Sequence, residues 1–99
     1  MTAIVQINFD IDAAAGYRKA AMAAVPKFKD MEGLIWKLWL IDEERKQGGG
    51  IYLFASRELA EAYAASDFVA GLRQRQAGVE VRVFDDLQEA SALTGAAFG

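Results

Sequence analysis

The chain has 99 residues, a formal net charge of −3, no cysteine and no histidine, and 54% of its residues are hydrophobic. This composition predicts one folded domain, residues 1–99, and the acidic balance argues against binding to a nucleic-acid backbone. The missing residue types exclude disulfides, thiol catalysis and the usual zinc and haem ligands, so we expect neither a metal nor a cofactor.

The first strand and helix are predicted from the N-terminal third. Ala3–Phe9 alternates and is rich in β-branched residues, as a strand does. Asp10 and Asp12 are candidate caps for an alanine-rich helix from about Ala13 to Lys29. Pro26 should kink or restart that helix, because proline has no N–H to donate.

A strand, a charged turn and a second strand are predicted for the middle of the chain. The strands are Leu34–Ile41 and Gly50–Phe54, and Asp42–Gly49 is interpreted as a flexible polar hairpin. Gly48–Gly50 is not a phosphate loop, because it precedes a strand, whereas phosphate loops follow a strand and open a helix.

The last part of the chain predicts two short helices, a strand and a final helical turn. Serines precede both helices as candidate N-caps. The predicted elements are a helix capped by Ser56 and ending near Ala65, a helix over Phe68–Gln76 capped by Ser66-Asp67, a strand over Val79–Phe84, and a turn capped by Asp85 or Asp86 that runs to Leu93 before a frayed tail.

The predicted order, β-α-β-β-α-β, is that of the α+β ferredoxin-like, or split βαβ, fold. Its four-stranded antiparallel sheet has strands one and three in the centre. RNA-recognition motifs share this order but stack bases on aromatic residues of these two strands. Here the corresponding positions hold Val5, Gly49 and Ile51, so we expect no nucleic-acid partner.

Alternation along each strand predicts two sheet faces, both containing large apolar residues. One set is apolar: Val5, Ile7, Phe9, Leu34, Trp36, Leu38, Leu40, Ile51, Leu53, Val79, Val81 and Val83. The other is mixed: Gln6, Asn8, Ile35, Lys37, Trp39, Ile41, Tyr52, Phe54, Glu80, Arg82 and Phe84. Helices can cover only one face, so we expect a second copy to cover the other in a two-fold homodimer.

The mixed set combines aromatic side chains with a few polar groups, as small-molecule pockets do. A purely structural interpretation stays open for each residue. Lys37 can extend to water from an edge strand, Arg82 and Glu80 can form an ion pair, and Asn8 can be a satisfied polar group at a strand end.

GLIWKLW, GGIYLF after the charged turn, the helix AEAYAA and the late VFD together resemble the YdhR-type mono-oxygenase family of the dimeric α+β barrel superfamily. The resemblance runs from about Gly33 to Leu93. It implies a sheet that closes a barrel with its two-fold mate and a ligand cleft between sheet and helices. Relatives include cofactor-free oxygenases of polycyclic phenols, haem-degrading enzymes and lactone isomerases; haem degradation fits least, because the axial histidine is missing.

With the cleft on the mixed face, the alanine-rich helix would leave room for a flat ligand, and Trp36 would lie in the barrel. We expect a small aromatic or phenolic substrate that supplies the electrons for its own reaction with O₂. The candidate catalytic residues are Lys37, as a base or oxyanion partner, Arg82, as a second oxyanion partner, and Asn8, as a holder of a carbonyl or O₂-derived oxygen. The candidate substrate-binding residues are Trp39, Tyr52, Tyr17, Trp36 and Phe54.

Two other functions remain open at this point: a non-enzymatic dimeric module that binds an aromatic ligand, and a cofactor-free isomerase. The N-terminus has neither the basic segment nor the apolar core of a signal peptide, and no apolar run approaches the roughly 20 residues of a membrane span. We therefore expect a soluble cytoplasmic protein without a membrane partner.

Overall fold

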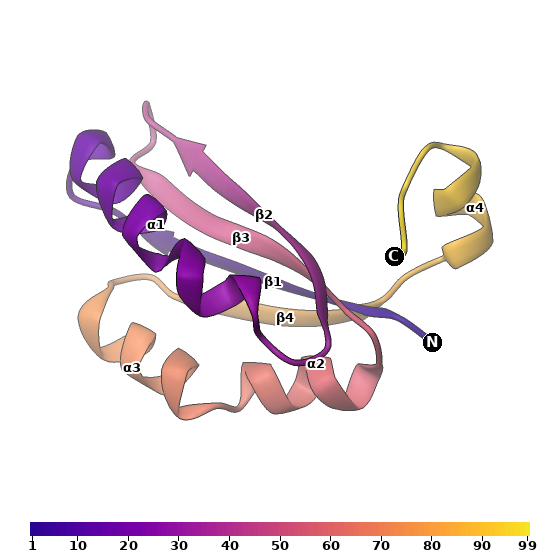
Figure 1. Cartoon of the computed structure of the whole chain (residues 1–99). Helices are drawn as coiled ribbons and strands as arrows, with labels where there is room; N and C mark the ends of the chain where they lie inside the picture. The colour runs from indigo at the N-terminus through magenta and orange to yellow at the C-terminus, as the bar shows by residue number, and fades with distance from the viewer.

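The computed structural model describes all residues, Met1–Gly99. Figure 1 shows one sheet with helices packed against it and a short C-terminal helix apart from the others. The elements are β1 (Ala3–Asp10), α1 (Ala14–Lys29), β2 (Leu34–Asp42), β3 (Gln47–Phe54), α2 (Arg57–Ala64), α3 (Asp67–Arg75), β4 (Glu80–Asp85) and α4 (Gln88–Leu93).

The sheet has the order β2-β3-β1-β4, with every neighbouring pair antiparallel. This confirms the ferredoxin-like prediction, with strands one and three in the centre. The predicted serine caps are also present, because Ser56 accepts a hydrogen bond from Leu59 N–H and Ser66 accepts one from Val69 N–H. None of the helices is long and apolar enough to cross a membrane.

Two predictions about helix ends were wrong. Helix α1 has Ala13 at its N-cap without a side-chain bond, because Asp10 belongs to β1, and α4 likewise lacks a side-chain cap. Asp86 instead accepts a hydrogen bond from the Thr2 hydroxyl.

Pro26 does not restart α1, which continues to Lys29. Proline is tolerated there because only one carbonyl loses its partner, close to an exposed helix end.

The triple glycine lies inside β3 rather than in a flexible hairpin, so that prediction was also wrong. The turn is short, and Asp42 closes it by accepting a hydrogen bond from Arg45 N–H at 3.0 Å. Gly48 to Gly50 are buried and pair with β1 and β2. Their lack of side chains has a packing reason, which appears at the site below.

The predicted sheet faces combined the wrong sides of different strands. The alternation within β1 and within β4 was right. Val5 lies directly opposite both Tyr52 and Val83, so these three share a face. A register shift between Leu34 and Trp36 further places Leu34 and Trp36 on opposite faces.

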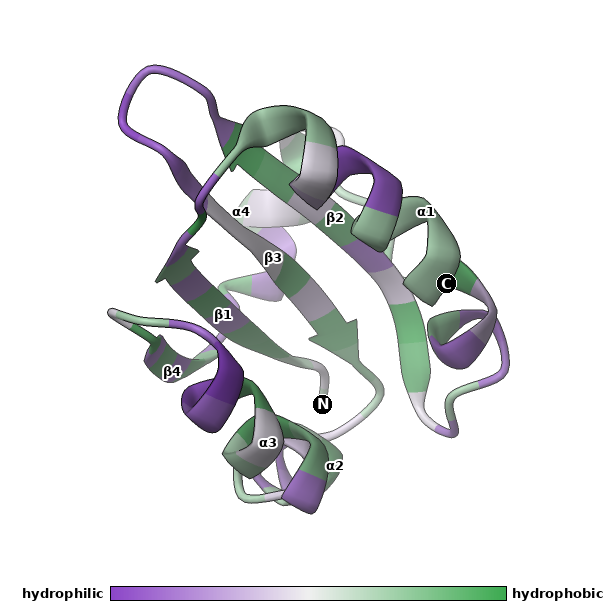
Figure 2. Ribbon diagram, turned by 90° about the vertical axis from the view of Figure 1, so that its left-hand side faces the viewer, coloured by the Kyte–Doolittle hydropathy of each residue, from purple (hydrophilic) through white to green (hydrophobic).

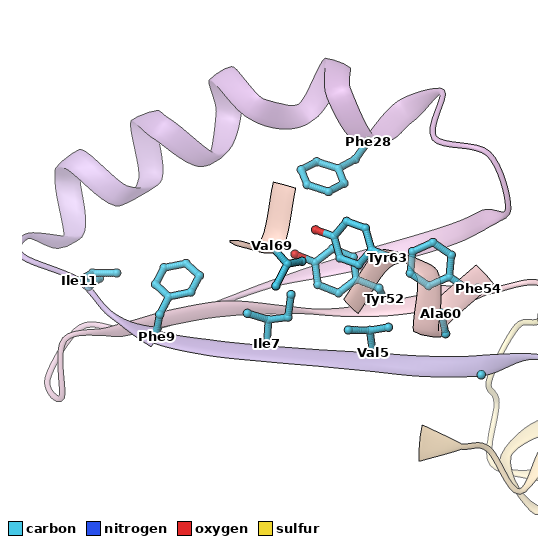
Figure 3. Packing of buried hydrophobic residues seen from close by; sticks show 11 residues of the cluster. Val5, Ile7, Phe9, Ile11, Phe28, Tyr52, Phe54, Ala60, Tyr63 and Val69 are labelled. Carbon is cyan, nitrogen blue, oxygen red and sulfur yellow. The ribbon is translucent and has the colours of Figure 1, made fainter. Parts of the chain in front are cut away.

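The helix-covered face therefore combines apolar residues of β1 and β4 with aromatic residues of β3. Figure 3 shows Val5, Ile7 and Phe9 on the side of β1 that faces α1, the helix that contributes Phe28. The buried cluster on this face comprises Ala3, Val5, Ile7, Phe9, Ile11, Phe28, Tyr52, Phe54, Ala60, Tyr63 and Val69. Continuous burial of this kind is the main favourable term in folding.

The opposite face is covered at one end by the C-terminal segment. Figure 2 shows α4 behind the sheet, away from α1 and α3. The Trp36 indole N–H donates to the Ala97 carbonyl at 2.8 Å, and Gly99 approaches Ile35. The tail is thus attached to β2 rather than frayed. Farther along this face, Leu38 is 55% exposed and Phe84 is 45% exposed.

Candidate functional site

A cleft of about 240 Å³ lies between α1, α3 and the sheet. Ala20, Ala21 and Ala24 form its α1 wall, and Phe68 and Leu72 belong to its α3 wall. The floor comes from the strands and includes Lys37, Trp39 and Tyr52. Because alanine side chains end at Cβ, α1 leaves space above these larger floor residues.

Lys37 is the polar centre of this floor, enclosed by three aromatic rings. Its Nζ lies 3.3 Å from the Trp39 ring centroid, 3.7 Å from that of Phe28 and 4.6 Å from that of Tyr52. All three distances are within the range of cation–π contact. No carboxylate forms an ion pair with Lys37, and its amine makes no hydrogen bond within the protein. The amine is therefore available to a ligand.

Burial lowers the pKa of the Lys37 amine from 10.5 to about 7. The cause is desolvation, which disfavours the charged form and is not offset here by an anion. The surrounding ring faces act in the opposite direction, because they attract the ammonium. At neutral pH the amine is thus able both to accept a proton and, once protonated, to stabilise an adjacent anion.

The backbone of β3 is close to the helix-side residues because it has no side chains at Gly48 to Gly50. A Cβ on Gly48 would lie 2.6 Å from the Tyr17 ring, and one on Gly50 would lie 2.9 Å from Cε of Lys37. The Tyr17 hydroxyl accepts from Gly49 N–H at 3.0 Å and lies 2.9 Å from the Leu40 carbonyl, to which it donates. Tyr17 therefore presents its ring, but not a free hydroxyl, to the cleft.

Tyr52 connects the cleft to the deeper core. Its ring lies 5.0 Å from that of Tyr63 and 6.4 Å from that of Phe54, centroid to centroid. Burial raises the pKa of both Tyr52 and Tyr63, so neither phenol ionises near neutral pH. Phe54 is only 1% exposed and does not line the cleft. Figure 3 shows the Tyr52 and Tyr63 hydroxyls pointing toward the same region beneath Phe28.

The predicted site residues separate onto the two sides of the sheet. Lys37, Trp39, Tyr52 and Tyr17 meet in the cleft. Asn8 and Arg82 lie on the other face. Arg82 is opposite Gln6, and Gln6 and Asn8 alternate along β1 with Val5, which is opposite Tyr52 on the helix-covered face.

The other-face residues already have partners. The Asn8 side-chain oxygen accepts from Gln6 at 3.1 Å, and Arg82 lies 3.8 Å from the Glu80 carboxylate. Trp36 is bound to the C-terminal tail on the same side. Grouping Asn8 and Arg82 with Lys37 was therefore wrong, whereas the prediction had placed Trp36 on the face opposite to Lys37.

Several cleft residues were missed by sequence reasoning. Phe28 completes the enclosure of Lys37, and Lys27, Phe68 and Arg75 line the cleft above it. The sequence around Phe28 predicts a helix, which does not say what this residue packs against. A glycine run flanked by strand-forming residues is a signal that could have located the floor, because it marks close approach of other groups to a strand.

Residues 4–97 match the family described as "Putative mono-oxygenase ydhR". The chain belongs to this family. Comparison with curated proteins finds no significant match.

The fold of this YdhR-family chain also occurs in solved structures of low sequence identity. A protein of unknown function from Nitrosomonas europaea has 13% identity and a TM-score of 0.69, over 87% of this chain and 89% of the other. A variant of SnoaB, a cofactor-independent oxygenase from Streptomyces nogalater, has 13% identity and a TM-score of 0.66, over 88% and 94%. A putative antibiotic biosynthesis monooxygenase from Deinococcus radiodurans has 11% identity and a TM-score of 0.65, over 85% and 91%.

Proposed function

We propose that this YdhR-family chain is a cofactor-independent mono-oxygenase of a small phenolic compound, bound in the cleft above Lys37. The observation that carries the proposal is a lysine amine with a pKa of about 7 and no anionic partner, on the floor of an aromatic cleft. Membership of a mono-oxygenase family and the fold shared with a cofactor-independent oxygenase support it.

The chemistry needs the substrate to provide its own electrons. Lys37 takes the proton of a phenol or enol, and the resulting anion transfers electrons to O₂. The keto tautomer of such a phenol has a CH₂ group ortho or para to its oxygen, and this CH₂ and O₂ become C=O and H₂O. One oxygen atom enters the product, and the other leaves as water with two hydrogens. The ammonium of Lys37 stabilises the intermediate anions without any further reductant.

The size of the cleft narrows the substrate. About 240 Å³ lies just below the usual range for ligand pockets, which starts near 300 Å³. One or two fused rings therefore fit better than a large polycyclic system. Trp39 and Tyr17 both line the cleft, and the Lys37 amine lies over the Trp39 ring, so a ligand ring that contacts the indole also meets the amine.

The homodimer belongs to the same proposal. Leu38 and Phe84 are exposed on the face that α1, α2 and α3 leave uncovered, and α4 covers only part of it. A second copy packed on this face would bury both residues. Lys37 and Trp39 point away from that face, so each subunit keeps its own cleft.

The proposed function is tested by a screen of one- and two-ring phenols and hydroquinones for binding, followed by O₂ uptake with each binder. We expect O₂ consumption with stoichiometric oxygenated product, and its loss in Lys37→Met while the phenol still binds. Lys19→Met, on the exposed surface of α1, is the matched control and should keep full turnover. Binding without O₂ consumption would instead indicate a ligand-binding module, and an isomeric product without O₂ an isomerase.

A further inference from the structure

The rim of the cleft is positively charged, although the whole chain has a net charge of −3. Three basic residues line the cleft, Lys27, Lys37 and Arg75, and no aspartate or glutamate does. Lys27 is contributed by α1 and Arg75 by the last turn of α3, so the two exposed cations belong to opposite walls. Lys37 lies on the floor.

These three cations are without carboxylate partners, whereas three arginines elsewhere on the chain have them. Arg18 pairs with Glu43, Arg57 with Glu61 and Asp85, and Arg82 with Glu80. Neither Lys27 nor Arg75 takes part in any ion pair. The positive charge that lines the cleft therefore has no acidic side chain to neutralise it, and an anionic ligand would do so.

The rim cations are also close to the aromatic lining. Lys27 Nζ lies 5.7 Å from the Phe68 ring centroid, and the Arg75 guanidinium lies beside Gly71 of its own helix. Because Gly71 has no side chain, Arg75 can lie along α3 at the cleft. Lys27 and Arg75 line the same cleft as Trp39, so an outward substituent on a ring bound at Trp39 can be reached by both cations.

We propose that the cleft selects aromatic acids, with the ring over Trp39 and Lys37 and a carboxylate between Lys27 and Arg75. This deepens the proposed function, on which it rests, by naming the substrate class as hydroxyarenecarboxylates rather than neutral phenols. Lys37 takes the hydroxyl, whereas the rim cations take the carboxylate. Arg75 offers a planar fork of donors that suits a carboxylate, and Lys27 adds a point charge.

The test compares two probes that differ in one charge, 1-hydroxy-2-naphthoate and its methyl ester, by titration at low ionic strength. We expect the wild type to bind the acid about 5- to 10-fold more tightly, the range expected for two exposed cations. The double variant Lys27→Gln/Arg75→Gln should lose most of this preference while keeping its affinity for the ester. Added salt should reduce the preference of the wild type in the same direction.

Matched controls separate the rim from general charge effects. Lys19→Gln lies on α1 and Arg73→Gln on α3, and neither residue lines the cleft, so the double control changes net charge equally. It should keep the preference. Equal binding of acid and ester by the wild type, or a preference that survives Lys27→Gln/Arg75→Gln, would overturn the inference. Binding of the ester with O₂ uptake would then leave the proposed oxygenase standing.

Discussion

The Nζ of Lys37 lies 3.3 Å from the centre of the Trp39 ring, two residues farther along the same strand. Alternation along β2 places both side chains on the helix-covered face, where Lys37 is opposite Tyr52 and Trp39 is opposite Gly50. The glycine leaves the indole without a cross-strand neighbour on that face. A cation and a flat ring are thereby combined on the floor of one cleft.

Lys37→Met should weaken binding of anionic phenols without changing the fold. The expected loss is about 1.5–3 kcal/mol, the range for a hydrogen bond to a charged group. The same change should raise the pH at which a bound phenol ionises, because a nearby positive charge favours the anion. A spectroscopic titration of one phenol against both proteins measures the two effects. An unchanged affinity and ligand pKa would make Lys37 a structural residue.

Trp39→Ala should weaken neutral and anionic phenols alike, by about 0.5–1.5 kcal/mol, because it removes ring stacking without removing charge. The same titration, run with a neutral phenol below its pKa and with its anion above it, provides the measurement. A loss confined to the anion would show that Trp39 acts only by holding the Lys37 amine. Phe84→Ala, on the opposite face, is the control and should leave both affinities unchanged.

Stability should rise with pH through Lys37, in the direction opposite to that of a lysine whose folded-state pKa is raised by a carboxylate partner. Its pKa is about 7 in the folded protein and 10.5 when solvated. Below pH 7 both states are protonated, and the burial penalty is fully present. Between pH 7 and 10.5 the unfolded state binds more protons, so the free energy of unfolding rises with pH.

Lys37→Met therefore should be more stable than wild type at pH 6, by on the order of 1–2 kcal/mol, since the amine is only partly desolvated. The difference should shrink as the pH approaches 10.5. Urea unfolding of both proteins across this range measures it. A difference that is constant with pH would show that the folded-state pKa is not lowered.

Alanine substitutions should change stability in opposite directions at a tightly packed glycine of β3 and at an exposed glycine of α1. A Cβ on Gly49 would lie 2.0 Å from the Ile7 carbonyl oxygen, and its φ of 155° is unfavourable for other residues, whereas Gly16 has no atom within 4 Å of that position. Gly49→Ala should lower the free energy of unfolding by about 1–3 kcal/mol. Gly16→Ala should raise it by about 0.5–1 kcal/mol. Denaturant unfolding checks both, and a tolerated alanine at Gly49 would contradict the packing.

Leu38→Glu should convert the proposed dimer to a folded monomer, because it places a charge on the uncovered sheet face. Met22→Glu is the control, since Met22 is 73% exposed on α1 and distant from that face. Light scattering at micromolar concentration should give twice 10.8 kDa for wild type and Met22→Glu. A wild-type monomer at 10.8 kDa would remove the homodimer from the proposal.

The order of the strands and helices could be predicted because hydrophobic periodicity, the serine caps and the charged turn agree with one another. The composition of each sheet face could not. Alternation fixes which residues of one strand share a side, but not how the sides of two strands correspond. That depends on register, such as Val5 opposite Tyr52 and the shift between Leu34 and Trp36.

Only part of the candidate site could be predicted, because its residues come from several strands and helices whose register the sequence does not give. Lys37, Trp39 and Tyr52 come from two strands joined by a short turn, and their side chains meet as expected. Asn8 and Arg82 come from strands linked through longer connections, and the expected grouping failed there. Phe28 and the rim residues Lys27 and Arg75 belong to helices whose rotation over the sheet depends on tertiary packing rather than on any local motif.

The two tryptophans lie on opposite sides of β2, and this gives the molecule a pair of independent optical reporters. Trp39 faces the cleft, whereas Trp36 is bound to the Ala97 carbonyl on the reverse side. In Trp36→Phe, the remaining indole emission will follow occupancy of the cleft. In Trp39→Phe, it will follow detachment of the C-terminal segment and burial of the uncovered face. The proposed ligand binding and the proposed dimerisation can thus be followed separately by fluorescence, without attaching any label.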